Sequence, residues 1–237
     1  MTAVSRTAVV TGAGSGIGAA TAKRLRVEGW SVLGLDLAGD DPDVVRVDVT
    51  DLAALEAAVA QLGDSPVDAL VLAAGIWSSE DDRYSVVPLD VWERTMAVNV
   101  TGAMLSLRVV APRLRPGSAV VTMASLAALT GIPKRDAYTA SKGAIVALTR
   151  AWAADLIRLG VRVNCVAPAQ VATPMTRHVT GLDKARLPLG REAEPAEIVE
   201  VIMSVISPAA SYLNGAIIPV DGGLTAASSL VSISLRE

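Results

Sequence analysis

The chain has 237 residues and a formal net charge of −3 at pH 7; 51% of the residues are hydrophobic and 19% are charged. This length suffices for one domain with a sizeable core, and the absence of a basic run excludes an extended nucleic-acid surface. Because no stretch has the unbroken apolar length of a membrane span or a signal-peptide core, we expect a cytoplasmic protein with no membrane partner.

The first expected element is a β-rich apolar run at 7–11, followed by a glycine-rich turn at 12–18 and a helical pattern at 17–28. A strand, a glycine turn and a helix start together form an anion site, in which backbone N–H groups and the helix dipole face a pyrophosphate. Glycine is required where a side chain would block that approach or where φ is positive. This order of elements predicts a dinucleotide-binding site.

The second expected strand, 31–36, ends in Asp36. An acid about twenty residues beyond the glycine turn accepts a hydrogen bond from a ribose 2′-hydroxyl and repels a 2′-phosphate. Ser15 and Leu37 occupy the positions where a 2′-phosphate would need a counter-charge, and neither is basic. The pattern therefore predicts NAD rather than NADP.

Further along the chain, apolar strand runs alternate with longer helical patterns. This alternation is typical of a parallel sheet that helices cover on both faces. Thr50 or Asp51 is the expected N-cap of the next helix. No linker or repeat divides the chain, so we expect one domain over 1–237. The remaining strands are expected at 44–47, 68–73, 118–124, 161–166 and 215–220, and the remaining helices at 51–61, 90–114, 137–159 and 195–206.

Two long connections, 76–87 and 172–194, follow strand ends at the sheet edge where ligands bind in open α/β folds. We expect the second connection to be a substrate lid. His178, the only histidine, lies in this connection and is expected to be an exposed loop residue. Cys165, the only cysteine, lies in the strand 161–166 and is expected to be a buried small hydrophobe. No Cys/His cluster has zinc-site spacing, so we expect no metal.

Tyr138 and Lys142 are four residues apart on one face of an expected helix, and Ser125 stands thirteen residues before the tyrosine. A phenol ionises near ~10, and a fixed positive charge nearby lowers that pKa. The phenol could then take a proton from an alcohol or return one to a ketone. Together with a redox cofactor in the same domain, these residues indicate an oxidoreductase.

These motifs together resemble the classical short-chain dehydrogenase/reductase family over nearly the whole chain. The matching segments are T-G-x-x-x-G-x-G at 11–18, Asp48-Val49, Ala73-Ala74-Gly75, Asn99, Ser125, Tyr138 with Lys142, P-G-x-V-x-T at 168–173 and the closing segment 215–223. Ala73 stands where the family usually has asparagine, and Ala169 where it has glycine; neither departure removes a catalytic group. The resemblance implies a single Rossmann-type, doubly wound parallel sheet of about seven strands with helices on both faces.

The resemblance also implies a role for each of four residues. Ser125 would orient the substrate oxygen, and Tyr138 would pass the proton. Lys142 would lower the tyrosine pKa and hold the nicotinamide ribose, while Asn99 would anchor a water that relays protons. Hydride would move between the substrate carbon and the nicotinamide of NAD. The implied NAD contacts are Gly12, Ser15, Gly16, Ile17, Gly18, Asp36, Asp48, Val49, Ala73, Ala74, Gly75, Tyr138, Lys142, Val171 and Thr173.

The leading hypothesis is an NAD-dependent dehydrogenase of a secondary alcohol or ketone. Segments within 189–223 resemble 3-oxoacyl-carrier-protein reductases, which mostly use NADP, and segments within 194–212 resemble bacterial hydroxysteroid dehydrogenases. A non-catalytic NAD-binding sensor is a third hypothesis, which predicts loss of Ser125, Tyr138 or Lys142. All three residues are present.

The last segment, 224–237, alternates partly between apolar and polar residues, which favours a strand or an arm. Family members are often tetramers with C-terminal segments at subunit contacts. We therefore expect a homotetramer, or a dimer, in which this tail packs on a neighbour. The expected partner otherwise is a small-molecule alcohol or ketone.

Overall fold

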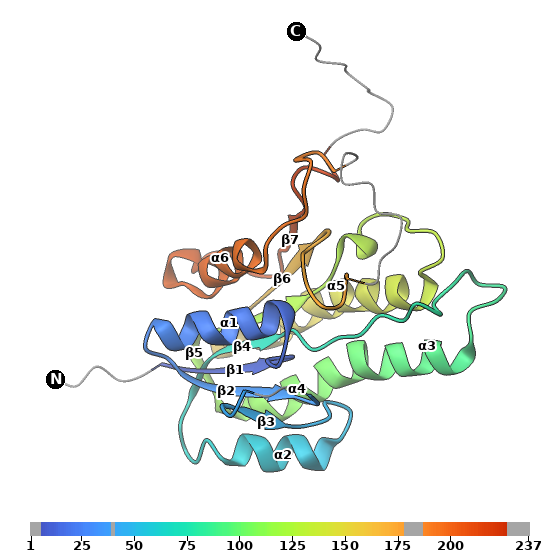
Figure 1. Ribbon diagram of the computed structural model, residues 1–237. Helices are drawn as coiled ribbons and strands as arrows, with labels where there is room; N and C mark the ends of the chain where they lie inside the picture. The colour runs from blue at the N-terminus through green and yellow to red at the C-terminus, as the bar shows by residue number, and fades with distance from the viewer. Residues whose placement is uncertain (1–5, 39–40, 178–186, 227–237) are drawn as a thin grey trace, which may run out of the picture.

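The computed structural model describes residues 6–38, 41–177 and 187–226 (Figure 1). The strands are β1 (Thr7–Thr11), β2 (Ser31–Asp36), β3 (Val44–Arg46), β4 (Val67–Leu72), β5 (Leu114–Met123), β6 (Arg162–Pro168) and β7 (Ile217–Val220). Within the described residues these seven strands form one parallel sheet in the order β3-β2-β1-β4-β5-β6-β7. The order reverses at β1 and β4, as in a doubly wound fold, so the predicted fold class is confirmed.

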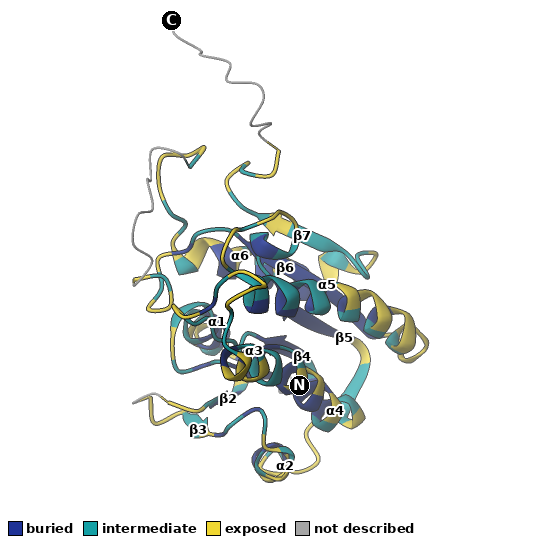
Figure 2. Ribbon diagram, turned by 90° about the vertical axis from the view of Figure 1, so that its right-hand side faces the viewer, coloured by how far each residue is buried: buried dark blue, intermediate teal, exposed yellow. Residues whose placement is uncertain are grey.

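The main helices are α1 (Gly16–Val27), α2 (Leu52–Ala60), α3 (Leu89–Met96), α4 (Gly102–Val110), α5 (Asp136–Leu156) and α6 (Pro195–Ile206). Alternate side chains of a strand point to opposite faces, so the sheet has an apolar layer on each side. Val9 and Leu70 belong to the layer under α2, α4 and α5, whereas Val10 and Val71 belong to the layer under α1 and α6. Figure 1 shows α1 and α6 together over the sheet, and Figure 2 shows the central strands coloured as buried.

The helix expected at 90–114 is interrupted. It comprises α3, a π-helical segment η1 (Ala97–Thr101), α4 and a 3-10 turn η2 (Ala111–Arg113), after which β5 begins earlier than expected. Single π-helical turns inside α-helices are often found at functional sites. Asn99 of η1 is buried. The Ile76 nitrogen donates a hydrogen bond to Asn99 Oδ1 at 2.7 Å, and Asn99 Nδ2 donates one to the Ile76 carbonyl oxygen at 2.9 Å. The interruption therefore coincides with a tertiary contact that helical periodicity does not reveal.

The other helices lie close to their expected ranges. Helix α6 coincides with the expected 195–206, and Asp51 is the N-cap of α2, where its carboxylate accepts a backbone hydrogen bond. The helix expected at 137–159 forms α5 and then a 3-10 turn η4 (Ile157–Leu159). It stops at Gly160, whose φ of 68° lies in the left-handed region that favours glycine.

Cys165 is fully buried in β6, as predicted. The central part of the expected lid, 178–186 with His178, lies outside the described residues, and so does most of the tail, 227–237. In the part of the chain that the structure describes, no helix combines the length and the apolar character needed to cross a membrane. The same residues contain no group of three or more His, Cys, Asp or Glu side chains arranged to hold a metal ion.

Candidate active site

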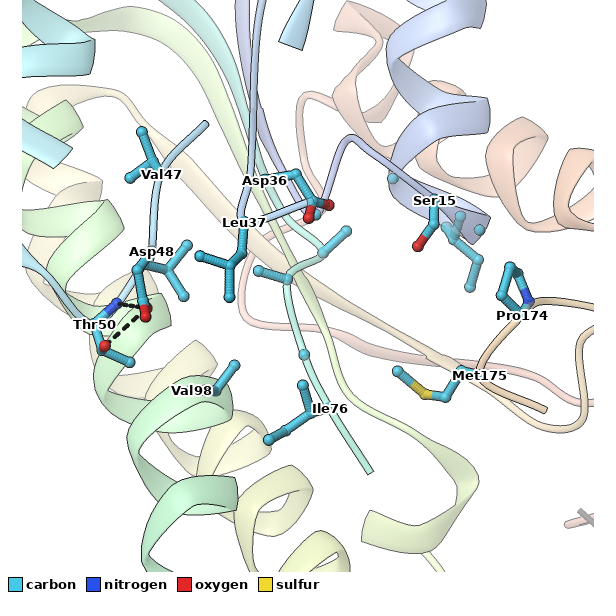
Figure 3. Close-up of a pocket in the computed structure, with 18 of the residues that line it drawn as sticks. Ser15, Asp36, Leu37, Val47, Asp48, Thr50, Ile76, Val98, Pro174 and Met175 are labelled. Carbon is cyan, nitrogen blue, oxygen red and sulfur yellow. Dashed lines mark hydrogen bonds between the residues drawn. The ribbon is translucent and has the colours of Figure 1, made fainter. Parts of the chain in front are cut away.

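A cavity of about 450 Å³ lies beyond the C-terminal ends of β1 and β4, where the strand order reverses (Figure 3). Ligands of open α/β sheets bind in this crevice. The predicted cofactor residues that line it are Gly12, Ser15, Gly16, Ile17, Gly18, Asp36, Asp48, Val49, Ala73, Ala74, Gly75 and Thr173. Val171, Tyr138 and Lys142 are not among the residues that line it. The fold thus gathers motifs that are far apart in the sequence around one space.

In the glycine turn between β1 and α1, the backbone at Gly12 lies close to the backbone at Ala73 and Ala74. Gly12 has a φ of +72°, and a Cβ at this position would lie 2.7 Å from the Ala74 nitrogen and 2.8 Å from the Ala73 carbonyl carbon. Ser15, the N-cap residue of α1, makes no side-chain capping hydrogen bond. The N–H groups of the first turn therefore lack that partner and, with the helix dipole, favour an anion.

Two carboxylates stand on the rim of this cavity. Asp36 accepts hydrogen bonds from the backbone nitrogens of Gly14, at 2.8 Å, and Ala38, at 2.9 Å. Asp48 accepts two from Thr50, drawn in Figure 3, and these bonds lower its pKa, with Arg94 adding a smaller effect. A carboxylate has about four acceptor sites, so each acid can still accept from a ligand.

Ser125 and Tyr138 meet beyond the C-terminal end of β5. Ser125 is the N-cap of a 3-10 turn η3 (Leu126–Ala128), where its Oγ accepts a hydrogen bond from the Ala127 nitrogen at 3.2 Å. Burial raises the pKa of Tyr138 above its ordinary value, and a side-chain hydrogen bond with Ser125 opposes this only in part. The serine therefore serves both as a cap and as the partner of the phenol.

Lys142 lies one helical turn beyond Tyr138 on α5 and is only 6% exposed. Its Nζ donates a hydrogen bond to the Met123 carbonyl oxygen at 2.9 Å and lies 5.7 Å from the centre of the Tyr138 ring. Burial lowers the pKa of Lys142 to about 8, and electrostatic attraction to Cys165 opposes this shift. The expectation that Lys142 lowers the tyrosine pKa is wrong for this geometry, because burial dominates both groups.

Asn99 links the end of β4 to the catalytic helix. Besides its bonds to Ile76, its Nδ2 donates to Ser141 Oγ at 3.0 Å, and Ser141 Oγ donates to the Tyr138 carbonyl oxygen at 2.7 Å. A Cβ at Gly75 would lie 3.3 Å from both Asn99 Oδ1 and Lys142 Nζ. Lys142 therefore reaches the wall of the first cavity, while the water relay expected at Asn99 stays a prediction.

Asp81 is a residue of the site that sequence reasoning missed. It is 4% exposed, and its two carboxylate oxygens accept hydrogen bonds from the backbone nitrogens of Ala137, at 3.1 Å, and Tyr138, at 2.8 Å. Arg135, the N-cap residue of α5, makes no side-chain capping bond, so Asp81 supplies the cap from a distant loop. Because 56 residues separate Asp81 from Ala137, no local pattern pairs them.

Ser125 and Tyr138, two of the predicted catalytic residues, line a second cavity of about 330 Å³. The residues that line it are Trp77, Ser125, Leu126, Ile132, Arg135, Tyr138, Ala169, Gln170, Met175, Thr176, Leu187 and Leu224. Met175 lines both cavities, so they lie next to each other. Val171 is buried and pairs with Ala193 in an isolated parallel bridge, which ties together the two ends of the expected lid. Ala169 and Gln170 line the second cavity and Thr173 lines the first, so the segment 168–173 runs between the two cavities.

The depressed pKa of Lys142 predicts a pH-dependent stability. The folded-state pKa is about 8, whereas that of an unfolded lysine is about 10.4, so the unfolded chain binds more protons between these values. Stability therefore rises with pH across this window. Relative to Lys142→Met, the wild-type free energy of unfolding should increase by about 2 kcal/mol from about pH 7.5 to about pH 9.5. Urea unfolding of both proteins measures this; a constant or falling difference would contradict the assigned burial of the ammonium.

The fold and the two adjoining cavities define a Rossmann-type protein with a dinucleotide crevice and a neighbouring Ser-Tyr-Lys group. Comparison with known sequences takes this further. The sequence model of the family described as enoyl-(acyl carrier protein) reductase matches residues 12–225. The chain belongs to the short-chain dehydrogenase/reductase family.

Its relatives include named dehydrogenases. The chain is 36% identical to 2-(R)-hydroxypropyl-CoM dehydrogenase of Xanthobacter autotrophicus, over 94% of this chain and 100% of that protein. It is 39% identical to galactitol 2-dehydrogenase (L-tagatose-forming) of Cereibacter sphaeroides, over 92% and 94%. A solved structure from Beutenbergia cavernae, with NADP bound at low occupancy, is 34% identical and superposes with a TM-score of 0.85 over 95% of this chain and 98% of that one.

Proposed function

We propose that this protein is an NAD-dependent oxidoreductase that interconverts a secondary alcohol and a ketone by hydride transfer. The observation that carries the proposal is the adjacency of the two cavities: Ser125 and Tyr138 line the second, and Lys142 reaches Gly75 at the wall of the first. A cofactor and a substrate would therefore meet at the same residues. The names of the Xanthobacter and Cereibacter relatives, both dehydrogenases of hydroxyl compounds, support the reaction class.

The first cavity fits a dinucleotide. The close approach at Gly12 and the first turn of α1 suit a pyrophosphate, and Asp36 suits a ribose with a free 2′-hydroxyl. The Beutenbergia structure holds NADP, so similarity alone does not select the cofactor. The proposal of NAD depends on the carboxylate of Asp36 and on the apolar Leu37 beside it.

In the proposed mechanism the nicotinamide, when bound, would accept or supply the hydride. Ser125 orients the substrate oxygen, and Tyr138 exchanges a proton with it: the hydroxyl proton moves to the phenolate during oxidation and returns during reduction. The raised pKa of Tyr138 favours the protonated phenol, which suits donation to a ketone, whereas oxidation of an alcohol requires the phenol to lose its proton first and is favoured at higher pH. Lys142 would hold the ribose hydroxyls of a bound cofactor, and Asn99 positions the backbone at Ile76.

A panel of secondary alcohols and ketones, assayed with NAD and NADP in parallel, tests this proposal. We expect reduced nicotinamide to form or disappear with at least one member, and kcat/KM to be higher with NAD. Cofactor binding without turnover of any member would instead favour the non-catalytic sensor. Turnover confined to acyl-carrier-protein substrates with NADP would favour the 3-oxoacyl reductase alternative, and turnover confined to steroids the hydroxysteroid dehydrogenase alternative. A cytoplasmic location and assembly as a homotetramer or dimer stay predictions.

A further inference from the structure

Among the residues that the structure describes, Arg135 is the only charged one that lines the second cavity. It is the N-cap residue of α5, three residues before Tyr138, and is half-buried. Its guanidinium carbon lies 3.9 Å from the centre of the Trp77 ring, so the group stacks on an aromatic face. Within the described residues, the guanidinium makes no ion pair and no hydrogen bond. The cavity therefore contains a cation, stacked on Trp77, whose donors have no partner in the described part of the chain.

Among the described residues no carboxylate forms an ion pair with Arg135, and Asp81 acts on its charge without a direct contact. Burial lowers the pKa of Arg135, and the charge of Asp81 opposes that shift. The carboxylate of Asp81, however, already accepts hydrogen bonds from the nitrogens of Ala137 and Tyr138. No carboxylate of the described residues lines the second cavity, whereas Asp36 and Asp48 line the first together with Arg94. A partly desolvated charge without a partner is costly to stability and often marks a functional site.

Two further donors lie in the wall around the guanidinium. The indole nitrogen of Trp77 and the amide nitrogen of Gln170 are buried and have no hydrogen-bond partner among the described residues. Both residues line the same cavity as Arg135. Both nitrogens are buried beneath the surface of the cavity, so Arg135 is the group that presents a positive charge to a ligand, and this charge fits an anion.

We propose that Arg135 binds a carboxylate of the substrate, so that the substrate is a small hydroxy acid and its product the corresponding keto acid. This inference rests on the proposed function. A guanidinium matches a carboxylate with two parallel hydrogen bonds, and stacking on Trp77 holds it in one plane. Arg135 and Tyr138 line the same cavity, so one ligand could place its carboxylate at the guanidinium and its reacting carbon at the phenol. A cavity of about 330 Å³ suits a ligand of this size.

Matched hydroxy acids and their methyl esters test the proposal. With 3-hydroxybutanoate and 4-hydroxypentanoate, wild-type kcat/KM for the acid should exceed that for the ester by roughly tenfold or more. Arg135→Gln should remove this preference mainly by raising KM for the acids, while the esters change by less than about threefold. Lys134→Gln is the matched control, because it removes a neighbouring exposed charge and should keep the preference. Equal losses for acid and ester, or no preference in the wild type, would overturn the proposal.

Binding of an unreactive acid separates this proposal from the proposed function. Pentanoate should change the fluorescence of the wild-type protein in a saturable way, because Trp77 stacks on Arg135, whereas pentanamide should not. The change should be lost in Arg135→Gln and in Trp77→Phe. If no alcohol is turned over but pentanoate binds through Arg135, the anion site stands and the proposed reaction fails. If alcohols are turned over without any preference for acids and pentanoate does not bind, the anion site fails and the reaction stands.

Discussion

Replacing Tyr138 by phenylalanine should reduce kcat/KM by roughly 10²–10⁴-fold, the range that a positioned proton donor contributes. The substitution removes only the hydroxyl, which hydrogen-bonds Ser125 and lines the second cavity. The first cavity is built from other residues, so the affinity for NADH should change by less than about threefold. Steady-state kinetics with the best substrate of the panel and a fluorescence titration with NADH measure the two quantities.

Tyr84→Phe is the matched control for this experiment. Tyr84 is 87% exposed, and losing its hydroxyl should leave both kcat/KM and NADH affinity unchanged. If Tyr138→Phe keeps full activity, the assigned proton donor is wrong. If it loses NADH binding as strongly as turnover, the phenol supports the cofactor site and its effect on catalysis is indirect. Ser125→Ala should also lose turnover, because Ser125 would orient the substrate oxygen.

Patterns that are local in the sequence predicted much of the fold. Strands buried on both faces appear as continuous apolar runs, which is why β1 and β4 were located within a residue. The glycine turn has a steric requirement that local geometry explains, because a Cβ at Gly12 would collide with the backbone at Ala73 and Ala74. Asp51 was one of two predicted caps of α2 because capping depends on a residue's own neighbours.

Features that depend on contacts between distant segments were not predictable. The π-helical turn at Asn99 accompanies hydrogen bonds to Ile76, 23 residues away, and helical periodicity contains no information about that partner. The cap of α5 comes from Asp81, and the stack on Arg135 comes from Trp77, both in the loop after β4. The acidic and aromatic composition of this loop does not indicate which helix the loop contacts in the folded chain.

The electrostatics of the catalytic pair required the structure as well. Sequence spacing predicts that Tyr138 and Lys142 share a face, and from spacing alone the cation should stabilise a phenolate. In the fold, both groups are buried, and Lys142 donates to the Met123 carbonyl oxygen. Burial disfavours the charged form of each group, so the pKa of the phenol rises and the pKa of the amine falls. Proximity sets which groups interact, whereas burial sets the direction of their shifts.

The proposed preference for NAD depends on one carboxylate with two roles. Asp36 stabilises the turn by accepting from Gly14 and Ala38, and its charge faces the cavity beside Leu37 (Figure 3). A 2′-phosphate would meet this charge without a basic partner at Leu37 or Ser15. Arg94, the basic residue that lines the cavity, lies near Asp48 instead.

Combining Asp36→Asn with Leu37→Arg should therefore move the preference toward NADP. The ratio of kcat/KM with NAD to kcat/KM with NADP should fall by roughly 100-fold, because repulsion is removed and a charge-assisted hydrogen bond is gained. Asparagine keeps one oxygen for the Gly14 nitrogen but loses the acceptor for the Ala38 nitrogen, so Asp36→Asn alone measures the cost to the turn and should shift the ratio less. Leu37→Arg alone keeps the carboxylate and should also shift it less, since the new cation pairs with Asp36. If the double variant keeps the wild-type ratio while it folds and turns over, Asp36 acts only on the turn and the selection of NAD lies elsewhere in the cavity.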